Sequence, residues 1–210
     1  MGLDLSKALK APISAQGWVG KIVIGGILLC IPIVNIIVFG YIIKYLTQVI
    51  NKDERLPEFS DIGNLFVTGL KAIIGSILLS IPMILITVII SILSDGFSSA
   101  TTLIIYLLEI IYGFISLIMI GNFAIDQKIL SMVGFNRAAL LVKDNSSLVP
   151  FILYLIILNI LYGVILTVCA VTIIGIILVP FGALAMFLSL YNLVGQFIQN
   201  APHLEEAKSL

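Results

Sequence analysis

The residue best placed to do chemistry is Glu109, the one ionisable side chain well inside a long apolar stretch, residues 102–125. At helical spacing, Tyr106, Tyr112 and Ser116 fall on the same face as its carboxyl. A charged side chain in the centre of a bilayer costs about 2.5–3.5 kcal/mol on insertion scales, so it usually faces protein or a wet cavity. One interpretation is a proton- or cation-binding carboxylate, for which no Lys or Arg at a similar depth supplies a counter-charge. The other is a protonated carboxyl that is hydrogen bonded to a hydroxyl or wetted from the membrane surface.

Two stripes of small and polar residues are typical of helix packing inside membranes. Small side chains let helix backbones approach closely, and amide and hydroxyl groups form hydrogen bonds between helices. The stripes are Thr68, Ala72, Ser76 and Ser80, at strict intervals of four, and Gly182, Ala185, Ser189 and Asn192, continued by Gln196. Two alternatives stay open beside packing within one chain: a seam between subunits for the first stripe, and a narrow solute path for the second.

No catalytic or metal-binding set can be assembled from the remaining residues. The only histidine, His203, lies in a polar tail, and Cys30 and Cys169 lie in apolar stretches without metal or redox spacing. The sequence contains no Ser-His-Asp set, no paired intramembrane acids and no phosphate-binding glycine motif. We therefore expect no enzyme, no metal and no cofactor. A net charge of zero without a basic stripe predicts no nucleic-acid partner.

Composition places these residues in a membrane. Hydrophobic residues make up 60% of the chain and charged residues 10%, with a mean hydropathy of +1.23, whereas soluble domains carry about 25% charged residues. A spanning helix needs roughly 20 apolar residues. Uncharged stretches of that length or more separate Lys21 from Lys44, Lys71 from Asp95, and Asp144 from Glu205, and the last can hold two spans.

The predicted fold is all-α: a polytopic helical membrane protein with a single transmembrane domain over residues 1–200 and a polar, frayed tail at 201–210. It has about five full or near-full spans plus a first segment broken at Pro32 and Asn35, and Pro180 predicts a second helix break. Short amphipathic helices are expected in the headgroup layer. The apolar segments are 18–50, 72–94, 102–125, 148–170 and 176–198, and the amphipathic stretches are 3–11, 62–71 and 135–143.

Topology depends on whether segment 18–50 crosses once or turns back at Pro32. Lys and Arg concentrate in cytoplasmic loops. A hairpin puts all eleven basic residues on one side, whereas a single crossing puts Lys7, Lys10 and Lys21 opposite the next group. We favour the hairpin, with both termini cytoplasmic in the cell membrane. Its first arm is roughly 21 Å long, shorter than the hydrocarbon core of about 30 Å, so its turn must be buried in protein.

The chain also resembles a known family. The similar stretches are residues 7–12 (KALKAP), 21–26 (KIVIGG) running on to 31–35 (IPIVN), Gly40-Tyr41, 56–59 (LPEF) and 65–71 (LFVTGLK). On these the chain resembles the domain-of-unknown-function family 4013, small multispanning membrane proteins of prokaryotes. The resemblance extends over nearly the whole chain. It implies a membrane protein of undetermined activity and supplies no catalytic or binding residue.

Two functions are consistent with the sequence. The first is a non-enzymatic, oligomeric scaffold or accessory subunit, whose partners are membrane lipids and a second copy or another membrane protein. The alternative is a small channel or transporter with Glu109 as its intramembrane proton or cation site. A hydrated cavity reaching Glu109 favours transport, whereas apolar surroundings favour the scaffold.

Overall fold

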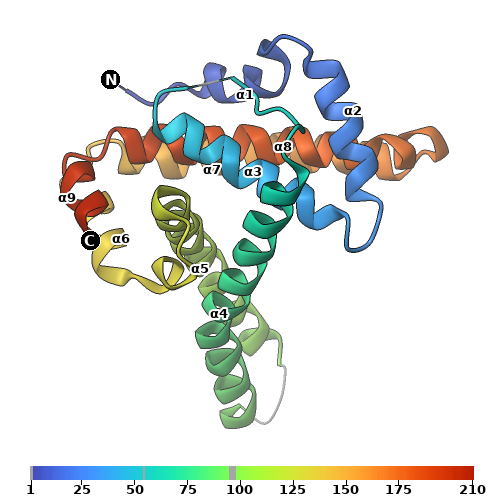
Figure 1. Cartoon of the computed structure of the whole chain (residues 1–210). Helices are drawn as coiled ribbons and strands as arrows, with labels where there is room; N and C mark the ends of the chain where they lie inside the picture. Colours follow the sequence, from blue (N-terminus) through green and yellow to red (C-terminus); the bar gives the residue numbers. More distant parts are fainter. Residues whose placement is uncertain (1, 54, 95–97) are drawn as a thin grey trace.

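The computed structural model describes residues 2–53, 55–94 and 98–210, which fold into helices without a strand (Figure 1). Three helical hairpins, α2–α3, α4–α5 and α7–α8, meet at one end of the molecule. The helices are α1 (Leu5–Ser14), α2 (Trp18–Leu29), α3 (Asn35–Ile50), α4 (Ile62–Leu93), α5 (Ser99–Asp126), the 3₁₀ helix η1 (Ile129–Val133), α6 (Phe135–Val142), α7 (Leu148–Ala170), α8 (Ile173–Gln199) and α9 (Leu204–Ser209). We call the shared end, made of α1, the 51–61 connection, η1, α6 and α9, the polar cap.

Helix α1 corresponds to the predicted amphipathic stretch 3–11. The carboxylate of Asp4 caps it by accepting a hydrogen bond from the backbone N–H of Lys7, at 3.0 Å. Gly17, with a φ of +70°, then redirects the chain, and α1 and α2 meet at 85°. Helix α1 therefore lies across the start of the first apolar segment.

The first apolar segment turns back near Pro32. Helix α2 ends at Leu29 and α3 begins at Asn35, so the predicted break is present at these residues. The Nζ atom of Lys21, at the start of α2, lies 2.8 Å from the carbonyl oxygen of Leu56, which follows α3 in the chain. Both ends of the segment therefore lie on one face. With 12 and 16 residues, the two arms are roughly 18 and 24 Å long, shorter than a hydrocarbon core.

The second hairpin corrects one expectation. Residues 62–71 are not a separate surface helix, because α4 runs unbroken over 32 residues after the Asp61 cap. Its first part packs against α3, so continuing the helix keeps both the backbone bonds and that contact. Helix α5 begins after Ser98, whose hydroxyl caps the N–H of Thr101. The predicted turn between these helices falls partly on 95–97, outside the described residues.

The third hairpin and the tail bring two further corrections. Helix α8 runs through Pro180, so the predicted break at this residue is wrong. A proline removes a single backbone donor, and packing along α7 maintains the rest of the helix. The tail forms α9 instead of fraying, because the buried Ala207 packs into the core and α9 contacts α6.

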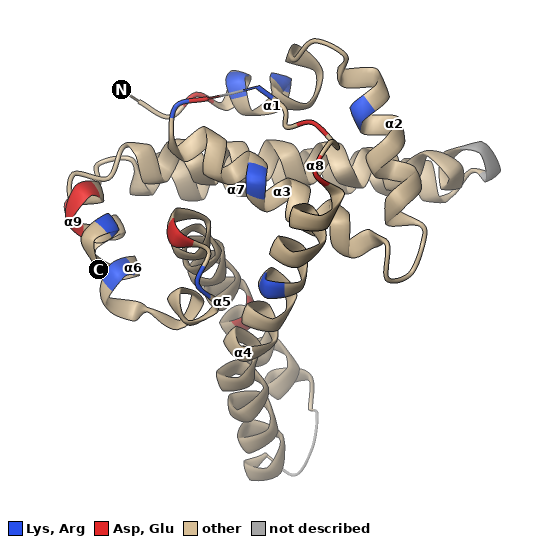
Figure 2. Cartoon of the chain, in the orientation of Figure 1, with Lys and Arg blue, Asp and Glu red and all other residues tan. Residues whose placement is uncertain are grey.

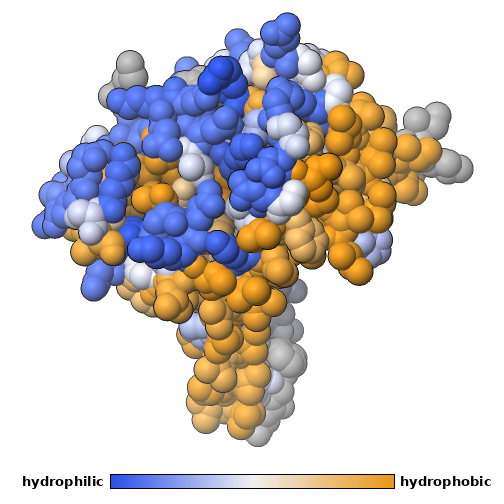
Figure 3. All heavy atoms as spheres, in the orientation of Figure 1, coloured by the Kyte–Doolittle hydropathy of each residue, from blue (hydrophilic) through white to orange (hydrophobic). Residues whose placement is uncertain are grey.

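The buried core gathers near the polar cap. The rings of Phe151 and Phe197 stack at 4.3 Å, and those of Tyr41 and Phe59 at 4.2 Å. Away from the cap, the α4–α5 and α7–α8 hairpins point in different directions (Figure 1), and the described residues of their outer parts carry mainly hydrophobic side chains (Figure 3). Leu93, at the far end of α4, is 80% exposed. The hairpins thus join at one end and separate at the other.

Four described helices, α4, α5, α7 and α8, are long and apolar enough to cross a membrane, or five if the bent pair α1 and α2 counts as one span. Figure 2 shows the Lys and Arg residues gathered at the cap and the inner parts of the hairpins, away from their far ends. The polytopic α-helical membrane fold predicted from the sequence is confirmed.

Candidate functional site

Glu109 lies on an exposed face of α5, in a groove beside α7 and α8 with a volume of about 500 Å³. Its carboxyl forms no ion pair with any described residue. Asn159 is the other polar lining residue, and its amide nitrogen already donates to the carbonyl oxygen of Leu155, at 2.8 Å. The remaining lining residues carry hydrocarbon side chains or none: Ile110, Gly113, Phe114, Leu117, Leu155, Ile156, Ile160 and Leu190.

The predicted polar face around Glu109 is divided in the structure. Tyr106 is 60% exposed, on the same uncovered side of α5. Tyr112 instead points to α4, where its hydroxyl donates to the carbonyl oxygen of Leu79. Ser116 donates to the carbonyl oxygen of Tyr112 within α5, at 2.8 Å. Of the four residues, Tyr112 therefore contacts another helix, Ser116 bonds within α5, and Glu109 and Tyr106 face outward.

The polar stripe on α8 is buried and hydrogen bonded to other helices. The hydroxyl of Ser189 lies 2.8 Å from that of Tyr162 on α7, and the amide of Asn192 donates to the hydroxyl of Tyr45 on α3, also at 2.8 Å. Gln196 continues the stripe and donates to Asn192 at 2.7 Å. These bonds join α8 to two neighbours, which is the chemistry of helix packing. The two tyrosine partners were not singled out from the sequence.

At the N-terminal end of the α8 stripe, the side chains pack less closely. Gly182 lies beside Leu166 of α7, where an added Cβ would come within 2.9 Å of that side chain, and Ala185 is half-buried. At the cap end, the side-chain amide of Gln196 accepts a hydrogen bond from the backbone N–H of Asp4, at 2.8 Å, and donates one to its carbonyl oxygen, at 3.2 Å. The N-terminal residues are thereby attached to the end of α8.

The small-residue stripe on α4 has two environments. Thr68 and Ala72 are buried, whereas Ser76 is exposed and Ser80 is half-buried. The closest approach of α3 and α4 uses glycines outside the stripe. A Cβ on Gly40 would overlap the backbone of Leu65, and one on Gly69 would overlap that of Ile36. Both glycines lie in stretches that carried the family resemblance, Gly40-Tyr41 and 65–71, but spacing alone did not identify this crossing.

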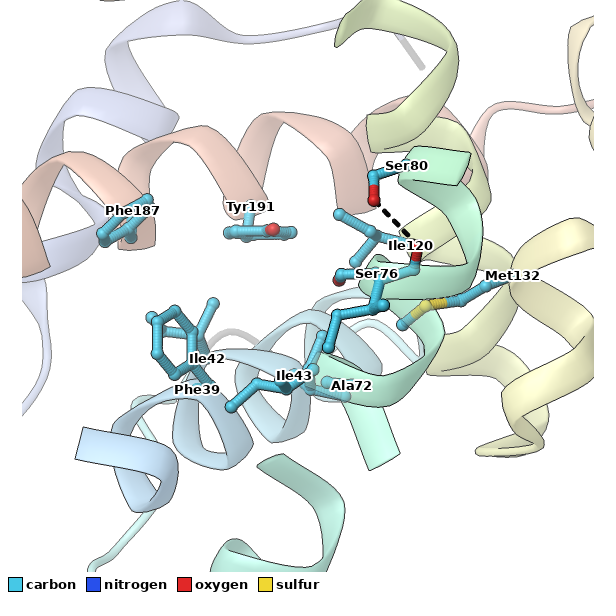
Figure 4. A pocket seen from close by; sticks show the side chains of 12 residues that line it. Phe39, Ile42, Ile43, Ala72, Ser76, Ser80, Ile120, Met132, Phe187 and Tyr191 are labelled. Carbon is cyan, nitrogen blue, oxygen red and sulfur yellow. Dashed lines mark hydrogen bonds between the residues drawn. The ribbon is translucent and has the colours of Figure 1, made fainter. Parts of the chain in front are cut away.

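Ser76 and Ser80 line a cavity of about 370 Å³ between α3, α4, α5 and α8 (Figure 4). Opposite them lies Tyr191 of α8, and the hydroxyl of Ser80 already donates to the carbonyl oxygen of Ile77, at 2.8 Å. The walls are otherwise mainly hydrocarbon: Phe39, Ile42, Ile43, Ala72, Ile73, Ile77, Ile120, Met132 and Phe187. Three hydroxyls among apolar walls supply weak polar contacts but no acid, base or nucleophile set.

A buried ion pair at the cap was not predicted. Arg137 of α6 donates to the carboxylate of Asp126, at the end of α5, at 2.8 Å, and their side chains are 7% and 17% exposed. Ser131 donates to the same carboxylate at 2.7 Å, and Arg137 also contacts the carbonyl oxygen of Asn122. These bonds indicate a structural role: the pair holds η1 and α6 against α5. The sequence signal was an acid at a span end followed by a base in an amphipathic stretch.

Within the described part of the chain, no group of three or more His, Cys, Asp or Glu side chains is placed to hold a metal ion. The sequence model of a family described as "Protein of unknown function (DUF4013)" matches residues 24–179. No curated protein and no solved structure matches the chain.

Proposed function

The chain belongs to the DUF4013 family of proteins of unknown function, and from this premise we propose that it is a non-enzymatic scaffold that assembles with a second copy of itself. The assembly lies in the cell membrane with both termini on the cytoplasmic side, where the polar cap meets water. Membrane lipids cover the hydrophobic surface that the second copy leaves open.

The observation that carries the proposal is the exposed position of Glu109 on α5. A carboxyl that faces acyl chains is costly, so a protein surface is expected to cover it. The groove offers Asn159, whose side-chain oxygen has no hydrogen bond within the described residues. In a two-fold assembly, the carboxyl of Glu109 of one copy forms a hydrogen bond with the side-chain amide of Asn159 of the other, and the two hydrocarbon walls pack together.

The turn of the first hairpin supports the same proposal. Irregular backbone at membrane depth is tolerated where it is buried in protein or lines a water-filled cavity. Within one chain, Ile31 and Ile33 beside Pro32 are 43% and 71% exposed. A second copy supplies the missing cover.

The alternative, a channel or transporter that uses Glu109, receives less support from the groove. Its lining has two polar side chains, Glu109 and Asn159, among hydrocarbon ones. Such a surface suits packing better than a hydrated path. In proteoliposomes, the scaffold predicts that Glu109→Gln leaves ion and proton flux at the level of the unmodified protein, whereas transport predicts that flux is lost.

Crosslinking in membranes tests the assembly. Starting from the Cys30→Ser, Cys169→Ser protein, Ile110→Cys places a thiol in the groove and Ile92→Cys places one near the far end of α4, both at exposed isoleucines of spans. We expect mild oxidation to give a covalent dimer at position 110 and little at 92, with a dimeric native mass in mild detergent. Equal crosslinking at both positions, or a strict monomer, would contradict the proposal.

A further inference from the structure

A second cavity, of about 820 Å³, opens at the polar cap between the α1–α2 corner, α3 and the 51–61 connection. Its volume lies in the range of small-molecule sites, roughly 300–1,000 Å³. Its lining is polar and basic, in contrast to the Glu109 groove. The residues that matter here are Lys21, Ile24, Lys44, Gln48, Arg55 and Glu58. We call it the basic cleft.

Two of its three cations are already neutralised. Lys21 lies 2.6 Å from the carboxylate of Glu58, and Arg55 lies 2.8 Å from that of Asp53. Lys44, half-buried on α3, forms no hydrogen bond or ion pair with any residue that the structure describes. Among the described residues, the cleft therefore presents one ammonium group without a counter-charge, and this local charge favours an anionic ligand.

One helical turn along α3 from Lys44 lies Gln48, which lines the same cleft. The side-chain oxygen of Gln48 is buried and has no hydrogen-bond partner. Leaving a buried acceptor unpaired is unfavourable, so a ligand that donates a hydrogen bond would gain from binding here. A complementary ligand thus combines a negative group for Lys44 with a nearby donor for Gln48.

The apolar side of the cleft indicates where the ligand comes from. Ile24 of α2 lines it, and the neighbouring Val23 and Ile27 are 42% and 51% exposed on the same helix. This hydrophobic surface leads from the cleft along α2, away from the polar cap. A molecule with a polar head and hydrocarbon chains can occupy both environments, whereas a free phosphate uses only the first.

We propose that the basic cleft binds an anionic glycerophospholipid whose headgroup carries hydroxyls, of the phosphatidylglycerol type. The phosphodiester accepts a hydrogen bond from Lys44, a headgroup hydroxyl donates to the oxygen of Gln48, and the acyl chains follow Ile24 and its neighbours along α2. This inference does not depend on the proposed dimer, because none of its residues lines the Glu109 groove.

Native mass spectrometry of the delipidated protein in mild detergent tests the site by titration with defined lipids. We expect phosphatidylglycerol to bind at least tenfold more tightly than phosphatidylcholine. Lys44→Gln should remove that preference, Lys44→Arg should keep it, and Lys143→Gln, the same charge change at an exposed cap residue outside the cleft, should leave it unchanged.

Two further measurements test the headgroup hydroxyl and the acyl chains separately. Gln48→Leu should reduce binding of phosphatidylglycerol towards that of phosphatidic acid, which lacks the headgroup hydroxyls. Soluble glycerol phosphate should bind weakly, since it lacks acyl chains. Equal losses in Lys44→Gln and Lys143→Gln, or soluble glycerol phosphate that binds as well as the lipid, would overturn the proposal. Unchanged helicity by circular dichroism and a single peak in size-exclusion chromatography show that each variant is folded.

Discussion

The polar cap and the far ends of the hairpins differ in how the chain covers its hydrophobic side chains. At the cap, Leu141 of α6 and Phe197 of α8 are fully buried, although short helices and connections surround them. At the far ends, Leu93 and Val171 are each 80% exposed. The most hydrophobic parts of this protein are therefore its least buried parts.

The difference follows from the two solvents. Water surrounds the cap, so apolar side chains there gain free energy by packing against one another. Acyl chains surround the far ends, and since lipid is as apolar as leucine, exposed hydrocarbon loses nothing there. Association of helices in lipid needs close packing or polar bonds, which the chain places at Gly40 and Gly69 and along the inner face of α8.

The largest effect is expected where two helix backbones touch. Gly69→Ala forces a Cβ onto the backbone of Ile36, so α3 and α4 must separate, at a cost of about 3 kcal/mol or more. Gly163→Ala, in the outer half of α7, meets no atom within 4 Å and should stabilise the helix by up to about 1 kcal/mol. Both changes in stability are measured from the midpoint of unfolding, followed by the loss of helicity as dodecyl sulfate is added to the protein in detergent micelles. Similar midpoints for the two variants would mean that the crossing is not a close contact.

Truncating one leucine at the polar cap and one at the far end of α4 compares the cost of losing an apolar side chain in water and in lipid. Leu141→Ala empties a fully buried site, and we expect a loss of about 2–3 kcal/mol of stability, in the lower part of the range for such changes because α6 is short and can partly collapse. Leu93→Ala should leave stability unchanged in lipid, where its side chain is 80% exposed. The same titration in bicelles measures both. A comparable loss at Leu93 would show that protein, not lipid, covers the far end of α4.

The smallest effect is expected at the turn of the first hairpin. Ile33 has a φ of +71°, a conformation that is costly for a β-branched residue, and its side chain is 71% exposed. Ile33→Gly should relieve about 1–2 kcal/mol of strain and lose part of this through chain entropy, for a net gain of at most about 1 kcal/mol. Ile31→Gly, at a residue without a positive φ, should destabilise instead. Thermal unfolding of the purified protein measures the sign of each change.

Much of the fold could be predicted from the sequence, because lipid insertion depends on the composition of one segment at a time. Residues 148–170 were predicted as a span and form α7 with the same bounds, and the break near Pro32 was expected from the chemistry of proline. The errors arose where neighbouring helices decided the outcome. Contact with α3 extends α4 back to Ile62, and packing along α7 keeps α8 helical through Pro180.

By itself, the sequence determined which segments are apolar, that the first of them is broken near Pro32 and that Glu109 lies within a span, since transfer free energies and the backbone chemistry of proline act over a few neighbouring residues. Only the tertiary structure decided which side chains meet. It divided the polar face of α5 between contacts with α4 and the open groove, paired Arg137 with Asp126, and placed Lys44 and Gln48 in one cleft. The physical reason is that such contacts depend on the rotation and crossing of whole helices, which residues distant in the chain determine together.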